Sequence, residues 1–134
     1  MKNKLIEQIL ENYNSYKNTI LRNIEEYSYR KIRYSVDFTV ALFIVEKELD
    51  SDFINEKVRD TDRVLKLDQN IVGIVFDFAD EEAGFRATEN ILSKMEASLF
   101  VSVVNSSGMV DDDEQIRKAF DTLIDEIRNH CEYQ

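Results

Sequence analysis

Apolar residues in the first part of the chain recur at steps of three and four, the spacing of one face of an α-helix. The pattern predicts one long helix over residues 3–28. Its apolar stripe comprises Ile6, Ile9, Tyr13, Tyr16, Ile20 and Tyr27, and Leu5, Leu10, Leu21 and Ile24 widen it. A helix this apolar on one side must bury that side. We expect it to pack either on its own domain or, as a dimerising helix, against a second chain.

Beyond this helix the pattern changes to short apolar runs separated by polar residues. Residues 38–45 are apolar without alternation, which is typical of a central strand covered on both faces. Residues 62–67 alternate and residues 71–78 form the return strand, so we expect a β-hairpin that turns at Asp68-Gln-Asn70. A further strand is expected at 99–104, and helical patterns occur at 50–57, from Asp80 and from Asp111.

The predicted order is one helix, then β-α-β-β-α-β, then a final helix. Strands that alternate with helices around one hairpin indicate an α/β (α+β) sandwich of the ferredoxin-like or palm type, with helices packed on the sheet. We therefore divide the chain into an N-terminal helix, residues 1–28, and a domain, residues 29–134.

Charge and cysteine content narrow the classes of function. The formal net charge is −10, which argues against partners such as DNA or RNA, because these require a basic surface. The same charge argues against an anionic membrane surface, and no apolar run reaches the roughly 18 residues of a membrane-spanning helix. The one cysteine, Cys131, cannot form a disulfide within the chain and suits a reducing cytoplasm.

The most informative motif spans the predicted hairpin. Arg59-Asp-Thr-Asp62 is followed by five residues and then by Asp68-Gln-Asn-Ile-Val72. This arrangement resembles the GGDEF domain family of bacterial diguanylate cyclases and their inactive relatives. In that family an Arg-x-x-Asp site, which binds cyclic di-GMP, stands five residues before the signature turn Gly-Gly-Asp-Glu-Phe. The resemblance extends over residues 19–130 through weaker matches at 19–23, 43–48, 53–56, 78–83, 99–104 and 116–120.

Departures from the family pattern imply that catalysis is lost. Asp68 and Gln69 replace the two glycines, and their side chains would crowd a nucleotide. Asn70 and Ile71 replace the family's Asp-Glu pair, and an aliphatic side chain cannot bind a metal ion. We therefore expect no catalytic residue, no metal and no cofactor. Glu46 and Glu48 stand where metal-binding acids would stand, but they lack the carboxylate partner at position 71.

The resemblance thus implies an inactive GGDEF-like signalling domain that acts through a homodimer or a partner signalling protein. An alternative is a cyclic di-GMP receptor that uses Arg59 and Asp62, since an arginine fork can bind phosphate or a guanine edge. The competing interpretation is that this arginine and aspartate simply pair with each other. An active diguanylate cyclase is disfavoured by residues 68–71.

Two other polar groups have plainer explanations. The acidic run Asp111–Glu114 lacks the ligand spacing of a calcium loop and is expected to cap the final helix. His130 and Cys131 are expected to be ordinary residues at the end of that helix.

Overall fold

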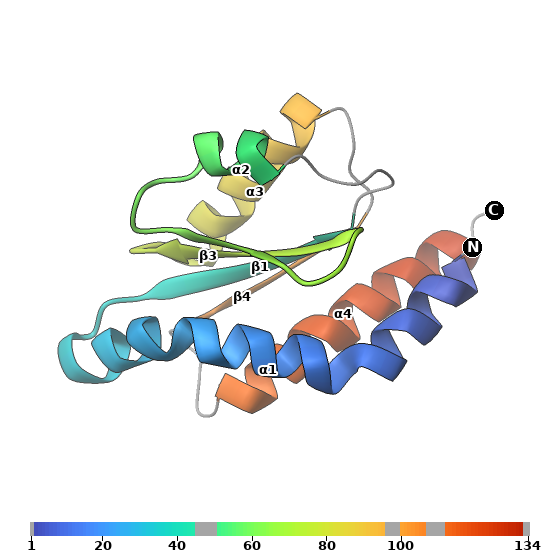
Figure 1. The fold of residues 1–134 in the computed structure, drawn as a ribbon, viewed down its shortest axis with the longest axis horizontal. Coiled ribbons are helices and arrows are strands. Elements are labelled where there is room, and N and C mark those ends of the chain that lie inside the picture. The colour runs from blue at the N-terminus through green and yellow to red at the C-terminus, as the bar shows by residue number, and fades with distance from the viewer. Residues whose placement is uncertain (1, 45–50, 96–99, 107–111, 133–134) are drawn as a thin grey trace.

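A computed structural model describes residues 2–44, 51–95, 100–106 and 112–132 of the chain. The elements follow the predicted order (Figure 1). They are α1 (Lys2–Tyr34), β1 (Phe38–Ile44), α2 (Ser51–Lys57), β2 (Arg63–Lys66), β3 (Ile71–Asp77), α3 (Glu81–Met95), β4 (Phe100–Asn105) and α4 (Asp112–Glu132). Each predicted strand is confirmed to within one or two residues at its described ends.

The sheet has four antiparallel strands in the order β2-β3-β1-β4. Helices α2 and α3 lie on one face, whereas α1 and α4 lie side by side on the other (Figure 1). This is the ferredoxin-like arrangement expected from the β-α-β-β-α-β order, with two further helices added to the open face of the sheet. The predicted fold class is confirmed.

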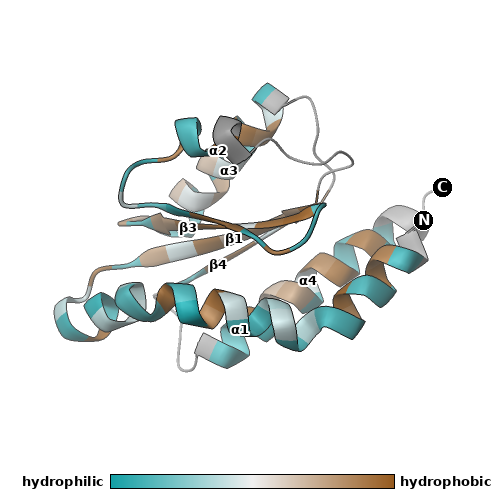
Figure 2. Ribbon diagram, viewed as in Figure 1, coloured by the Kyte–Doolittle hydropathy of each residue, from teal (hydrophilic) through white to brown (hydrophobic). Residues whose placement is uncertain are grey.

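Both faces of the two central strands are buried, because each face meets a layer of helices. Every residue of β1 and of β3 is buried. Side chains such as Leu42 and Ile71 pack under α1 and α4, whereas their neighbours Phe43 and Val72 pack under α3. Figure 2 shows the strands coloured as predominantly hydrophobic, with polar residues along the outer sides of the helices. The continuous apolar runs in the sequence follow from this double coverage.

Helix α1 is longer than predicted and packs on its own domain. It continues six residues beyond the predicted end, to Tyr34, and stops where Ser35 adopts a left-handed backbone with φ of 57°. The Ser35 amide donates to the Lys31 carbonyl at 3.0 Å, which is an αL helix cap. The predicted stripe packs against α4 and the sheet, with Ile9 and Ile20 both at 0% exposure. Leu10 is the exception: it was expected to widen the stripe, but it is 59% exposed. The domain boundary proposed between residues 28 and 29 falls inside this helix and stays a prediction.

Buried polar contacts fix the junction between β3 and α3. Asn105 Nδ2 donates to Thr39 Oγ1 at 2.7 Å and to the Ala79 carbonyl at 2.9 Å, and Thr39 Oγ1 also donates to that carbonyl. Asp80 caps the start of α3, because its Oδ1 accepts from the Ala83 amide. A Cβ atom at Gly84 would lie only 2.4 Å from Thr39 Cγ2, so the close approach of α3 to β1 requires glycine there.

Candidate functional site

Residues 68–72, which the family resemblance aligns with the signature turn, lie partly in the core. The amides of Leu67 and Asp68 both donate to the Ile71 carbonyl, at 3.0 and 3.1 Å, which closes the hairpin. Ile71 is 0% exposed and packs under α1 and α4. Val72 is 2% exposed and packs on the opposite face. Of the five predicted turn residues, Ile71 and Val72 therefore stabilise the fold, and Asp68, Gln69 and Asn70 remain to make polar contacts.

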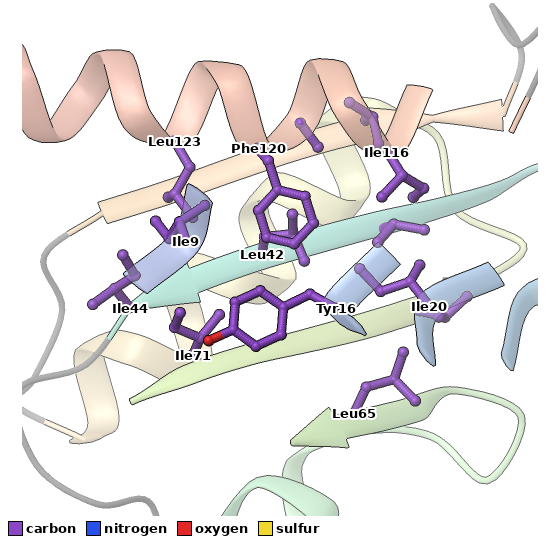
Figure 3. Packing of buried hydrophobic residues seen from close by; sticks show 14 of the residues in the cluster. Ile9, Tyr16, Ile20, Leu42, Ile44, Leu65, Ile71, Ile116, Phe120 and Leu123 are labelled. Carbon is purple, nitrogen blue, oxygen red and sulfur yellow. The ribbon is translucent and has the colours of Figure 1, made fainter. Parts of the chain in front are cut away.

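Helix α1 holds these polar residues. Gln8 Nε2 donates to Asp68 Oδ2 at 3.0 Å and to Asn70 Oδ1 at 3.2 Å. The Tyr16 hydroxyl donates to Asp68 Oδ2 at 2.5 Å. Figure 3 shows the Tyr16 ring within the apolar cluster, with its oxygen directed toward Ile71 at the start of β3. The turn is thus bound by two side chains of its own chain.

The contact between Tyr16 and Asp68 shifts the titration of both groups. The hydrogen bond from Tyr16 holds the pKa of Asp68 below its ordinary value of 3.8. Burial, and then the hydrogen bond to Asp68, raise the pKa of Tyr16 to about 12. At neutral pH the pair is therefore a phenol that donates to an ionised carboxylate, the stronger kind of hydrogen bond.

Sequence reasoning missed Gln8 and Tyr16 as site residues. The sequence places Tyr16 only in the apolar stripe, and no pattern in it marks Gln8. The available signal was weak: a tyrosine on a buried stripe must find a partner for its hydroxyl. That partner is 52 residues away in the chain, and no local pattern identifies it.

Arg59 and Asp62 bind each other. Asp62 Oδ2 accepts from the Arg59 amide at 2.9 Å and from Arg59 Nε at 3.2 Å. Asp62 Oδ1 accepts from Arg59 Nη2 at 3.0 Å and from the Asp77 amide at 2.8 Å. A carboxylate has about four lone-pair sites, so the acceptors of Asp62 are all in use. The Asp62 side chain is 2% exposed, whereas that of Arg59 is 57% exposed.

A cluster of arginines surrounds this pair at the end of β3. Arg59 Nη2 donates to the Asp77 carbonyl, and Arg30 pairs with the Asp77 carboxylate at 3.1 Å. The guanidinium groups of Arg30 and Arg63 both lie against the Tyr27 ring, 5.0 and 5.5 Å from its centroid. Burial raises the pKa of the Tyr27 hydroxyl, which donates to the Thr61 carbonyl. Contacts from α1 therefore hold this end of the hairpin as well.

The predicted site residues form two separate groups. Asp62 precedes β2, whereas Asp68–Asn70 follow it, so the two groups lie at opposite ends of the hairpin. Two open hollows of about 500 Å³ lie along α1, and neither includes a predicted site residue.

The other candidate residues add no ligand cluster in the part of the chain that the structure describes. No group of three or more His, Cys, Asp or Glu side chains there is placed to hold a metal ion. Glu46, Glu48 and Asp111 lie outside the described residues, and so do the side chains of His130 and Cys131. Asp113, in the first turn of α4, pairs with Lys17 at 3.0 Å. Within the same described ranges, every helix is too short or too polar to cross a bilayer.

The fold of this chain is similar to that of solved structures, although no similarity was found at the level of sequence. No protein-family model matches the chain, and no curated protein sequence matches it. Solved structures do. The GGDEF domain of FimX from Pseudomonas aeruginosa matches with a TM-score of 0.69 and 12% identity, over 84% of this chain and 88% of that one.

Two further structures agree with that match. A DGC protein from Thermotoga maritima has a TM-score of 0.65 and 14% identity, over 80% of this chain and 93% of that one. The isolated GGDEF domain of PA1120 (TpbB or YfiN) from Pseudomonas aeruginosa has a TM-score of 0.63 and 12% identity, over 87% of this chain and 83% of that one. The chain therefore has the fold of GGDEF domains, as its hairpin motif suggested.

Proposed function

We propose that this chain is a catalytically inactive GGDEF-like domain in cytoplasmic bacterial signalling, and that it acts by binding another protein chain. One observation carries the proposal. The hairpin turn, where the family resemblance places catalysis, has Ile71 buried in the core and Asp68 held by Tyr16 at 2.5 Å. The turn therefore contributes to the packing of α1 rather than presenting an open edge.

The chemistry of nucleotide cyclisation supports this conclusion. Phosphoryl transfer depends on cations that neutralise the charge of the reacting phosphates, and such cations need oxygen ligands. At the positions of the signature acids the chain has the amide of Asn70 and the aliphatic side chain of Ile71. The Asn70 oxygen already accepts from Gln8. A substrate would also have to approach past the side chains of Asp68 and Gln69, and the negative charge of Asp68 would repel a triphosphate.

The test is a turnover assay with GTP and Mg2+, followed by mass spectrometry for cyclic di-GMP. We expect no product from the protein, while an active diguanylate cyclase under the same conditions serves as the positive control. The Gln8→Ala/Tyr16→Phe double variant releases the polar turn residues without supplying metal ligands, so it should stay inactive too. Turnover by the wild-type protein would overturn the proposal.

Cyclic di-GMP binding at Arg59 and Asp62 is the second candidate. It is favoured by the Arg59 side chain, which is 57% exposed and carries a fork suited to phosphate or guanine. Binding would require Asp62 to give up hydrogen bonds that it already makes. Isothermal titration calorimetry decides the matter: a receptor releases heat that Arg59→Ala abolishes. Absence of binding at high micromolar ligand would remove this candidate.

A further inference from the structure

Helix α1 and strand β3 end at the same end of the molecule (Figure 1), and four large apolar side chains near these two ends are exposed. The ion pair between Arg30 and Asp77, the last residue of β3, joins the two elements there. We call these four exposed side chains the end surface. They are, with their exposed fractions, Tyr29 (59%), Ile32 (86%), Tyr34 (64%) and Phe78 (73%). The rings of Tyr29 and Tyr34 contact each other, with centroids 6.5 Å apart, and exposure of several large apolar side chains at one end is a feature of interaction sites.

The backbone at Phe78 has an unusual conformation. Ser35 and Phe78 are the non-glycine residues with positive φ in the part of the chain that the structure describes, at 57° and 55°. Each adjoins or belongs to the end surface. A left-handed backbone is costly for a residue with a Cβ atom, and exposure of a phenylalanine ring to water is costly as well. Phe78 thus carries two local penalties, which is the signature of a residue kept for contact with something outside the chain.

Charges of both signs flank the end surface. Residues 29–34 contain Arg30, Lys31 and Arg33 and no acid, although the chain as a whole carries a net charge of −10. Residues 80–82, which follow Phe78 directly, are all acidic. Several of these charges have internal partners, for example Lys31 with Asp37. Arg33 and Glu81 are exposed, and neither has an ion pair among the described residues.

We infer that the end surface is where two copies of this chain pair about a two-fold axis, a step that rests on the proposed interaction function. A two-fold axis brings the same patch of both copies together, so a patch with a basic and an acidic side can complement itself. Arg33 of one copy would then face Glu81 of the other, twice. This local match opposes the repulsion between two chains that are acidic overall.

The size of the surface predicts a weak dimer. Aromatic side chains bury 150–250 Å² each when fully covered, so four partly exposed side chains from each copy would bury roughly 1,000 Å² in total. That area is at the lower end of specific interfaces, where association is transient. We expect a dimer that dissociates in the micromolar range.

Sedimentation equilibrium of the full chain, from low to high micromolar concentration, tests the inference. Phe78→Gly removes the ring and suits the left-handed backbone, so the variant should fold while its dimer dissociation constant rises by about tenfold or more. Leu10→Glu is the matched control, because Leu10 is also 59% exposed on α1. It lies about 30 Å along the helix from Ile32 and should leave the dimer unchanged.

Exchanging the charges at positions 33 and 81 distinguishes the loss of a contact between copies from the loss of folding. Arg33→Glu and Glu81→Arg should each weaken the dimer, and the double variant should restore it. A wild-type protein that remains monomeric at high micromolar concentration overturns the inference. A dimer that is indifferent to Phe78→Gly and to the charge exchange also overturns it, yet leaves the proposed function standing. Turnover of GTP would overturn the proposed function whether or not the dimer forms, so the two failures are distinguishable.

Discussion

The two ends of the β2–β3 hairpin differ in what covers them. At the turn, Gln8 and Tyr16 from the first half of α1 bind Asp68, and Ile71 is fully buried. At the opposite end, the last residues of the same helix leave Ile32 and Phe78 largely exposed. One helix therefore closes the end of the hairpin where the GGDEF resemblance places catalysis and frames an open surface at the other.

This contrast agrees with the proposed loss of catalysis. Under that proposal, a turn that needs no metal ligands can take aliphatic and amide residues, and these residues can anchor a helix. The buried apolar residues that specify the sheet do not depend on catalysis, so the architecture persists. What remains available for function is the surface that the fold leaves uncovered.

The largest effect is expected at the turn. Ile71→Glu would place a carboxylate in the apolar core, and we expect it to lower the free energy of unfolding by about 4 kcal/mol or more in urea denaturation. Gln69→Glu adds the same charge at an exposed position of the same turn and should change stability by less than about 0.5 kcal/mol. Equal stabilities of the two variants would mean that the turn can open to present an acid.

A smaller loss is expected at the other end of the hairpin. Asp62→Ala removes the carboxylate that accepts from Arg59 and from the Asp77 amide, and it should destabilise the fold by about 3 kcal/mol. Asp60→Ala removes an exposed acid from the same loop and should cost less than about 0.5 kcal/mol. If Asp62→Ala retained full stability, the pair would be free for a ligand and the receptor alternative would gain weight.

Tyr16→Phe tests the polar contact between α1 and the turn. Loss of its hydrogen bond to Asp68 should cost about 1–2 kcal/mol, measured by urea denaturation at neutral pH. Tyr13→Phe is the control, because the buried Tyr13 hydroxyl has no hydrogen-bond partner within the described structure. Its removal should be neutral or slightly stabilising.

The same contact predicts how stability varies with pH. The pKa of Tyr16 is raised to about 12, so its stabilising contribution is complete below pH 10 and is lost as the pH rises toward 12. The pKa of Asp68 is lowered, so its contribution is present above pH 3.8 and is lost as the pH falls through the lowered value. Tyr16→Phe should reduce the loss of stability at both acid and alkaline pH. An unchanged pH dependence would contradict the hydrogen bond between Tyr16 and Asp68.

The smallest effect is a gain. Phe78→Gly should raise the free energy of unfolding of the monomer by about 0.5 kcal/mol, since glycine relieves the left-handed backbone at a modest entropic cost. Phe78→Ala keeps the Cβ atom and therefore the strain, so it should be less stable than the glycine variant. Denaturation at low protein concentration measures both. A glycine variant no more stable than the alanine variant would remove the argument from backbone strain.

The fold was largely predictable from the sequence, since its signals are local. The unbroken apolar runs of β1 and β3 indicated strands covered on both faces, and the alternation of residues 62–67 located the hairpin. The end of α1 was missed because none of residues 29–34 is buried, and the apolar stripe that revealed the helix stops at Tyr27. A serine in the left-handed conformation ends the helix, and serine is a weak stop signal.

The site was predictable only in part. The pairing of Arg59 with Asp62 was foreseen as one alternative, because the two residues are three apart and oppositely charged. The contacts of Gln8 and Tyr16 with Asp68 were not foreseen, since they depend on where a distant helix crosses the sheet. The end surface was missed for the same reason: the sequence does not show that Tyr34 and Phe78 lie at one end of the molecule.

Titration of the isotope-labelled protein with GTP and Mg2+, followed by proton–nitrogen correlation spectra, examines the turn itself. If α1 occupies this end of the hairpin, the chemical shifts of the backbone amides of residues 68–72 stay unchanged at high nucleotide concentration. Changes in those chemical shifts that saturate with nucleotide concentration would contradict the account, because they would mean that the turn is open to GTP.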